Sequence, residues 1–214
     1  MSETNIDINQ SNSYNQDNEK PEYFYKFRSL SNLRYFLDII LNNRLFASTF
    51  QNLDDPMEGI YKSDKSLRGV VTDNILKEKG NYRICSLTDN YSNPLMWSFY
   101  AEEGRGCCIK LKVKEGIEPV KVSYDSCVEA SAFGDVKGIL QHKLRQWEFE
   151  NEWRVLTNEQ YVPIETCAIY LCSRMEKDES IFYLDLFRHL NIPEVGVVSP
   201  QNDGTYELTT KKTK

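Results

Sequence analysis

The sequence Trp-Glu-Phe-Glu-Asn-Glu-Trp-Arg-Val at residues 147–155 decides the fold, because a helix pattern changes to a strand pattern within it. Before it, apolar residues recur at helical spacing and predict a helix over residues 135–148. After it, polar and apolar residues alternate and predict a half-buried strand over residues 151–156. If the strand geometry extends back two residues, Glu150, Glu152 and Arg154 point the same way.

Two carboxylates and a guanidinium on one face have two interpretations. Charged runs are usually solvated, so the three groups could form a surface ion pair on an edge strand. Alternatively, they form a catalytic carboxylate pair framed by two Trp, because such charges are costly to bury unless they are paired or used. The pattern leaves both interpretations open.

The composition is typical of a globular protein with one domain. The chain has 214 residues, of which 27% are charged and 12% aromatic, and its formal net charge is −6. This acidic balance argues against non-specific nucleic-acid binding. No apolar run reaches membrane-spanning length and the N-terminus has no apolar signal core, so we expect a cytoplasmic protein with no membrane partner. Six cysteines without a CxxC pair favour buried thiols in a reducing compartment, and we expect no metal.

Strand and helix patterns alternate along the chain. Residues 23–28 and 44–49 are predicted strands, and an apolar stripe over residues 33–41 predicts a helix between them. The remaining predicted strands are at residues 82–87, 107–113, 120–124, 166–173 and 194–198, and the remaining predicted long helices are at residues 66–79 and 176–190. Turn-like residues 116–119 predict that the strands on either side of them form a hairpin.

The loop at residues 52–59 is acidic and contains an Asp-Pro pair. Its carboxylates Asp54, Asp55 and Glu58 could bind a divalent ion. The alternative, which we favour, is a turn in which an Asp side chain accepts hydrogen bonds from nearby backbone N–H groups. Arg154 is predicted to pair with Asp55 or Glu58 and so tie this loop to the sheet.

A short helix is predicted to begin at Asn93-Pro94, with Asn as the N-cap and Pro at the first helical position. It is unusually rich in aromatic residues, which include Trp97, Phe99 and Tyr100. These rings either belong to the core or form the wall of a cleft for a flat ligand.

Three segments are expected. Residues 1–20 are a disordered leader, residues 21–200 a single α+β domain, and residues 201–214 a frayed polar tail. We expect the domain to have a mostly antiparallel sheet with flanking helices.

Several of these motifs together resemble a bacterial family that is catalogued only as a domain of unknown function. The family pattern runs approximately Asn-Asp-Pro-x-Glu, Met-Trp-x-x-Tyr-Ala and Trp-x-x-Glu-x-Glu-x-Arg. The resemblance covers about residues 23–156, and this chain has Asp54 where the family usually has Asn.

The order of the polar motifs also resembles the ADP-ribosyltransferases, which use NAD. Those enzymes have a polar or cationic residue on a first strand, then a Ser-Thr strand, then a Glu at the start of a late strand. Here Arg28, Ser48-Thr49 and Glu150-Asn151-Glu152 follow that order. The first strand has no His, which leaves open whether Tyr25 or Arg28 takes the first role. The resemblance implies a split sheet, NAD as substrate, an unidentified macromolecular or small-molecule acceptor, and a toxin or anti-phage role.

The chemistry of NAD cleavage gives these residues roles within the resemblance. Breaking the bond between nicotinamide and ribose develops positive charge on the ribose, which a fixed carboxylate stabilises. Glu152 is the candidate for that carboxylate, held by Ser48, and Glu150 the candidate for orienting or deprotonating the acceptor. Arg28 would bind the pyrophosphate.

The aromatic residue Tyr100 or Trp97 would stack on the nicotinamide ring.

Two other functions compete with this one. The first is a metal-dependent nuclease or phosphoesterase that uses the acidic groups. The second is a non-catalytic binding module in which the carboxylates pair with Arg154 and Lys143.

Overall fold

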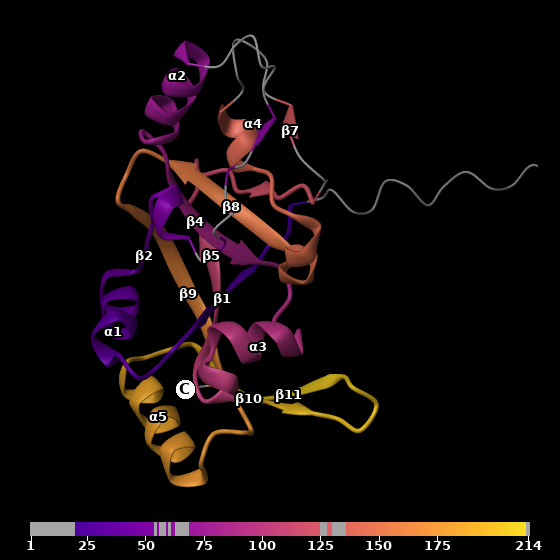
Figure 1. The fold of residues 1–214 in the computed structure, drawn as a ribbon. Coiled ribbons are helices and arrows are strands. Elements are labelled where there is room, and N and C mark those ends of the chain that lie inside the picture. Colours follow the sequence, from indigo (N-terminus) through magenta and orange to yellow (C-terminus); the bar gives the residue numbers. More distant parts are fainter. Residues whose placement is uncertain are drawn as a thin grey trace, which may run out of the picture.

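The computed structural model describes residues 20–53, 55, 59, 61–62, 69–124, 128–129 and 136–212. The expected leader lies outside these residues except for Lys20, which pairs with Glu118 at 2.8 Å. The described residues form a mixed α+β structure with a mostly antiparallel sheet and flanking helices (Figure 1), as the sequence predicts.

Within the described residues one sheet has nine strands, in the order β11-β10-β9-β5-β1-β4-β8-β6, and β2 pairs with β9. Its neighbouring strands are antiparallel except β9 and β10, which are parallel. The strands are β1 (Phe24–Arg28), β2 (Arg44–Phe46), β4 (Arg83–Thr88), β5 (Cys107–Val113), β6 (Val120–Lys121), β8 (Glu152–Thr157), β9 (Tyr161–Cys172), β10 (Glu194–Pro200) and β11 (Tyr206–Lys212). A separate parallel pair joins β3 (Tyr61–Lys62) to β7 (Val128–Glu129).

The sheet divides between its central strands β1 and β4. These two strands pair at Tyr25 and Thr88 alone among the described residues, whereas β1 pairs with β5 at five positions and β4 pairs with β8 at six. The rest of β1 and the rest of β4 therefore separate, and their facing edges are open to a ligand or to side chains.

The helices are α1 (Leu33–Asn42), α2 (Val70–Lys79), α3 (Pro94–Tyr100), α4 (Val136–Leu140) and α5 (Lys177–His189), with 3₁₀ turns η1 (Phe50–Asn52), η3 (Glu102–Gly104) and η4 (Arg145–Glu150). Helix α1 ends at Asn43, which has the left-handed conformation (φ 48°). Helix α3 begins as predicted, because the Asn93 side chain accepts a hydrogen bond from the Leu95 N–H and Pro94 follows it. None of the helices in the described segments is both long and apolar enough to span a membrane.

Two buried clusters cover the two faces of the sheet. Helices α1 and α5 pack on one face through Phe36 and Phe187, whose ring centroids are 5.3 Å apart. Helix α3 packs on the other face through Met96 and Trp97. A third cluster joins α2 and α4 to Ile84 of β4. Because these clusters fix the strands from both sides, the division between β1 and β4 is held open by the fold.

Three expectations about these elements are wrong. The predicted hairpin does not form: β6 pairs with β8, and β5 lies between β1 and β9. The helix predicted over residues 135–148 ends at Leu140, because the backbone after it pairs with Ser123 instead, and η4 follows. Seven residue pairs join β11 to β10, so the tail is a sheet strand from Tyr206 to Lys212.

Candidate functional site

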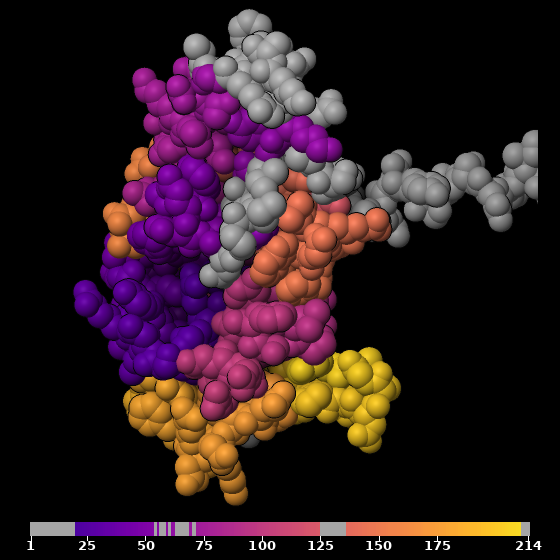
Figure 2. Space-filling model, in the orientation of Figure 1, coloured from indigo at the N-terminus to yellow at the C-terminus, as the bar shows by residue number. Residues whose placement is uncertain are grey.

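A cleft of about 1300 Å³ lies where β1 and β4 separate. Its lining residues come from β1, α1, β2, η1, β4, α3, η4, β8 and β9 and from the loops between them. Figure 2 shows the hollow between the indigo surface of α1 and the magenta surface of α3. The cleft exceeds the usual size of a small-molecule site, so a dinucleotide fits its volume. Its polar lining includes Lys26, Arg28, Ser48, Ser86, Tyr100, Lys143, Glu150, Glu152 and Arg154.

Glu152 and Arg154 form a bidentate ion pair on β8. The Nε and Nη2 atoms of Arg154 donate to the two carboxylate oxygens of Glu152 at 2.8 and 2.9 Å, and its Nη1 donates to the Leu140 carbonyl at 2.6 Å. Burial alone would raise the pKa of Glu152, but Arg154, followed by Lys143 and the Ser86 hydroxyl, lowers that pKa to about 2. Glu152 is therefore a fixed carboxylate that stays ionised at physiological pH.

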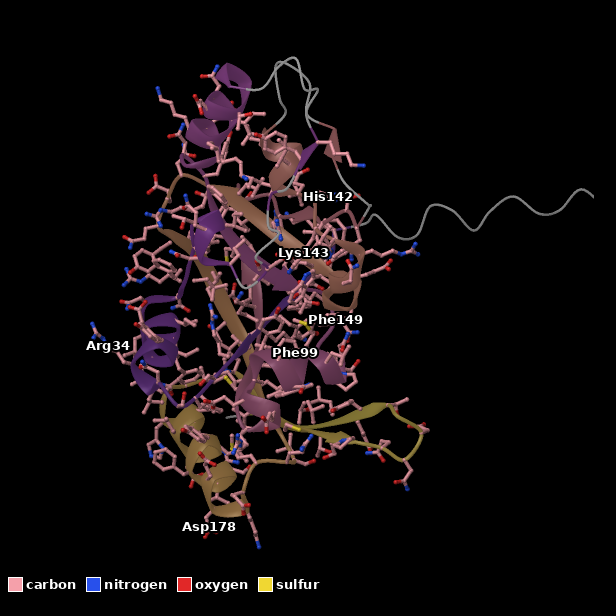
Figure 3. The ribbon with its side chains drawn as sticks, in the orientation of Figure 1. Arg34, Phe99, His142, Lys143, Phe149 and Asp178 are labelled. Carbon is pink, nitrogen blue, oxygen red and sulfur yellow. The ribbon has the colours of Figure 1, made fainter. Side chains whose placement is uncertain are left out.

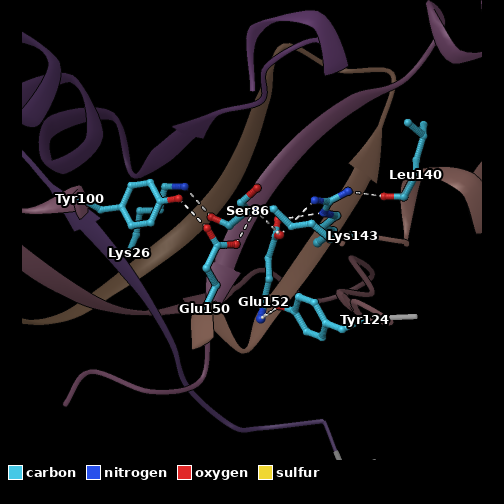
Figure 4. A network of polar contacts seen from close by, with 9 residues as sticks. Lys26, Ser86, Tyr100, Tyr124, Leu140, Lys143, Glu150 and Glu152 are labelled. Atoms are coloured by element: carbon cyan, nitrogen blue, oxygen red, sulfur yellow. Dashed lines mark hydrogen bonds and ion pairs between the residues drawn. The ribbon is translucent and has the colours of Figure 1, made fainter. Parts of the chain in front are cut away.

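Glu150 is buried beside this pair and meets different donors. Its Oε1 accepts a hydrogen bond from the Tyr100 hydroxyl at 2.5 Å, and its Oε2 accepts one from Lys143 Nζ at 2.5 Å. Figure 4 shows Glu150 between Tyr100 and Lys143. Burial raises the pKa of Glu150 and the charge on Glu152 raises it further, although Lys143 opposes both effects. Glu150 is thus the carboxylate of the pair whose protonation can change during a reaction.

A turn at Asn151 brings the two carboxylates together. Glu150 ends η4, Asn151 is left-handed (φ 46°), and Glu152 begins β8. The strand geometry therefore does not extend back to residue 150, although the two carboxylates do line one cleft. Asp89 holds the turn, because it accepts hydrogen bonds from the Asn151 side chain and from Trp153 Nε1, the latter at 3.0 Å.

Lys26 of β1 lies next to Tyr25, the position after which β1 and β4 no longer pair. Its Nζ donates to the Ser86 carbonyl of β4 at 2.6 Å (Figure 4), which bridges the two strands where they no longer pair. Burial and then the nearby Arg28 lower the pKa of Lys26 to about 8, against the opposing effects of Cys85, Glu152 and Glu150. Lys26 is not among the site residues predicted from the sequence, since the pattern of a single strand does not indicate that the neighbouring strand separates from it.

An aromatic rim borders the cleft beside Glu150. The Phe99 side chain is 64% exposed, its ring centroid lies 5.8 Å from that of Phe149, and Phe149 lies 6.0 Å from Trp147. Figure 3 shows Phe99 and Phe149 next to each other, below Lys143 in that view. Phe99 lines the cleft and offers an exposed ring face to a flat ligand.

Most of the residues singled out in the sequence meet in this cleft. Its lining includes Tyr25, Arg28, Ser48 and Tyr100, together with both carboxylates. The Ser86 hydroxyl of β4 donates to the Glu152 carboxylate, in the place where a contact from Ser48 was expected.

Trp97 and Thr49 lie away from the cleft lining. Of the two rings considered for stacking, Tyr100 lines the cleft, whereas Trp97 belongs to the core. Trp97 is 2% exposed, packs edge-on to Phe27 and donates its Nε1–H to the Tyr91 carbonyl. Its apolar spacing in α3 did not distinguish the core from a cleft wall. Thr49 precedes η1 and is outside the residues that line the cleft.

The acidic loop is described only in part. Asp55 is buried, whereas Asp54 and Glu58 lie outside the described residues. The pairing of Arg154 with Asp55 or Glu58 therefore stays a prediction. Among the residues that are described, no three His, Cys, Asp or Glu side chains are grouped to hold a metal ion.

Comparison with models of protein families, with curated proteins and with solved structures gives no match to this chain. A fixed carboxylate, a second carboxylate of raised pKa, cations on β1 and an exposed aromatic ring surround one space. These groups suit a ligand that carries a flat ring and anionic groups and that reacts through a positively charged transition state.

Proposed function

We propose that this protein is an ADP-ribosyltransferase-like enzyme that cleaves NAD and transfers its ADP-ribose to an acceptor. The observation that supports this most is the meeting of Arg28, Ser48, Tyr100, Glu150 and Glu152, which are distant in the sequence, around one cleft at the division of the sheet. The division of the mostly antiparallel sheet between β1 and β4 is a second observation that supports the proposal. Cytoplasmic NAD is the substrate in this proposal, and the acceptor is a hydroxyl or another nucleophile.

In the proposed reaction the bond between the ribose C1′ and the nicotinamide nitrogen breaks. Nicotinamide leaves as a neutral molecule with the bonding electron pair, and positive charge develops on the ribose. Glu152 supplies a fixed negative charge toward that ribose, because Arg154 holds its carboxylate in one orientation. The acceptor oxygen forms the new bond to C1′, and its proton passes to Glu150.

The assignment of the proton to Glu150 follows from its contacts. The carboxylate of Glu152 is engaged by both arms of the Arg154 fork, by the Ser86 hydroxyl and by Lys143 at 3.4 Å. The described contacts of Glu150 are one donor on each oxygen, and burial already raises its pKa toward the range of a general base.

The test is release of nicotinamide from NAD by the wild-type protein and by Glu150→Gln. We expect Glu150→Gln to lose at least roughly 100-fold in rate, the range for a lost general base. Glu148→Gln is the matched control, since this carboxylate is in the same turn but its side chain is 60% exposed, and it should keep the wild-type rate. Thermal melting of each variant establishes that it is folded.

A second variant keeps the test informative if Glu150→Gln folds poorly. Tyr100→Phe removes the hydrogen bond that lowers the pKa of Glu150, so the acid limb of the rate profile should move to higher pH. No nicotinamide release by the wild-type protein would refute the proposal. Phosphoesterase activity that EDTA abolishes would support the metal-dependent alternative instead.

The pairing of both carboxylates with cations favours a second candidate, a non-catalytic binding module. Lys143 bonds Glu150, and Arg154 bonds Glu152, so both negative charges are balanced inside the protein. This candidate predicts that a nucleotide binds without turnover. Calorimetry with NAD, combined with the nicotinamide assay, distinguishes binding alone from catalysis.

A further inference from the structure

The cations that line the cleft outnumber its carboxylates, and Lys26 is one of the cations in excess. Glu150 and Glu152 are balanced by Lys143 and Arg154, at distances from 2.5 to 3.4 Å. Lys26 lies beside these four residues, and its described hydrogen bond goes to a neutral acceptor, the Ser86 carbonyl. Among the described residues no carboxylate is within ion-pair distance of Lys26. An ammonium group has three donors, so it retains capacity for a ligand.

A second cation lies close to the first. Lys26 and Arg28 are two residues apart on β1, so their side chains leave the same face of the strand, and both line the cleft. Arg28 acts on Lys26 as a like charge and lowers its pKa. Two neighbouring cations repel each other, and an anion that binds between them removes that cost.

We infer that Lys26 is an anion-binding residue of this cleft and that, together with Arg28, it binds the phosphate groups of a nucleotide. The inference rests on the proposed function in one respect, because NAD carries a pyrophosphate. Two residues along a strand span about 6.6 Å at roughly 3.3 Å per residue, so the two cations can approach different oxygens of one pyrophosphate. Phosphate oxygens bind both ammonium and guanidinium groups well.

The location of Lys26 explains why the site would be selective for an extended anion. Its Nζ is anchored on the Ser86 carbonyl, so the charge is held at the division of the sheet and does not move freely in solvent. The aromatic rim at Phe99 also lines this cleft, so a ligand with phosphates at β1 can place a ring near Glu150.

The experiment is calorimetric titration of the full chain with inorganic pyrophosphate and, separately, with ADP-ribose. We expect the wild-type protein to bind both, Lys26→Met to bind at least tenfold more weakly, and Lys26→Arg to bind within about threefold of wild type, since it keeps the charge. Lys114→Met is the matched control, because it removes the same charge from an exposed turn outside the cleft lining. It should bind as the wild type does.

The dependence of ligand binding on pH distinguishes an anion-binding role of Lys26 from a purely structural role. The titratable groups that act on Lys26 are Arg28, Cys85, Glu152 and Glu150. ADP-ribose is the probe for this series, because its phosphates stay fully ionised in this range. Its binding by the wild type should weaken from pH 7 to pH 9 as Lys26 loses its proton, whereas its binding by Lys26→Arg should stay nearly constant.

Two results would overturn the inference: equal binding by Lys26→Met and wild type, or no binding of either probe by the wild type. The proposed function fails separately. Pyrophosphate binding that depends on Lys26, without nicotinamide release from NAD, leaves this site intact and removes the reaction. If instead Lys26→Met releases nicotinamide and binds pyrophosphate as the wild type does, the proposed reaction stands and the role of Lys26 is removed.

Discussion

At the scale of single residues, Glu150 and Glu152 are two positions apart but have opposite electrostatics. Arg154 lowers the pKa of Glu152, whereas burial raises that of Glu150. The difference arises because the Arg154 fork reaches both oxygens of one carboxylate, while the other meets a hydroxyl and an ammonium. Pairs of carboxyl groups with pKa values that are separated in this way are suited to divide the roles of fixed charge and proton acceptor.

The Glu152–Arg154 pair predicts a specific acid sensitivity. The folded-state pKa of Glu152 lies below its ordinary value of 4.5, so its contribution to stability is present above pH 4.5 and is lost as the pH falls toward 2. At roughly 1.4 kcal/mol per pKa unit this contribution is about 3 kcal/mol. We expect Glu152→Gln to lower the free energy of unfolding at pH 7 by about this amount and to flatten its dependence on pH between 4.5 and 2.

Urea unfolding across that pH range measures the effect. The raised pKa of Glu150 acts in the opposite direction, since it favours the folded state as the pH falls toward 4.5. Glu148→Gln, at an exposed position of the same turn, should leave the profile unchanged. An acid dependence as steep in Glu152→Gln as in the wild type would contradict the assignment.

At the scale of elements, α3 and η4 are joined by one side chain. Asn93 accepts a hydrogen bond from the Leu95 N–H, which caps α3, and its side-chain amide donates to the Phe149 carbonyl at 2.5 Å. The first contact orients the helix that carries Tyr100, and the second holds the turn that carries Glu150. Asn93 therefore positions both partners of the Tyr100–Glu150 hydrogen bond without lining the cleft itself.

Two substitutions at this position separate its two contacts. Asn93→Ala removes the cap and the contact with Phe149, and we expect it to lower the free energy of unfolding by roughly 1–3 kcal/mol. Asn93→Asp keeps the cap acceptor but removes the donor to the Phe149 carbonyl. The carboxylate oxygen in its place faces that carbonyl and repels it, so both variants should be less stable than the wild type and release nicotinamide more slowly. If Asn93→Ala melts and reacts as the wild type does, α3 and η4 are held by other contacts.

At the scale of the whole molecule, the cleft and the edge of the sheet at β11 are separate. The cleft lies at the division between β1 and β4, whereas β11 is the outermost strand beyond β10 (Figure 1). Tyr206 and Leu208 of β11 pack against the cluster beneath α3. This edge strand therefore supports the sheet and covers β10 without contributing to the cleft lining.

Removal of residues 201–214 should weaken the fold without changing the intrinsic activity. It uncovers the edge of β10 and the contacts of Tyr206 and Leu208, so we expect a loss of roughly 2–4 kcal/mol in unfolding free energy and more aggregation. Calorimetric melting and light scattering measure these effects, and nicotinamide release is normalised to folded protein. A variant with Thr at positions 206 and 208 keeps the backbone pairing of β11 with β10 and isolates the contribution of the two packed side chains. A lower rate of nicotinamide release per folded molecule would contradict the conclusion that β11 is separate from the cleft.

The sequence by itself determined the local elements. The apolar stripe of α1, the Asn93-Pro94 start of α3 and the alternation in β8 each depend on residues close in the chain, so their patterns predicted them. It also identified Glu150, Glu152 and Arg28 as candidates, because their order along the chain resembles a known arrangement. It did not predict the end of α4, the partner of β6 or the pairing of the tail, since these depend on contacts between distant segments.

Only the tertiary structure decided how the candidate site is built. The separation of β1 from β4 creates the cleft, and it brings Lys26, Ser86 and Lys143 beside the two carboxylates from different elements. Trp97 is in the core for a similar reason, because the orientation of α3 against the sheet selects which of its rings are buried. Residue spacing fixes the directions of side chains within one element, but the packing between elements fixes which of them share a space and which charges remain unbalanced.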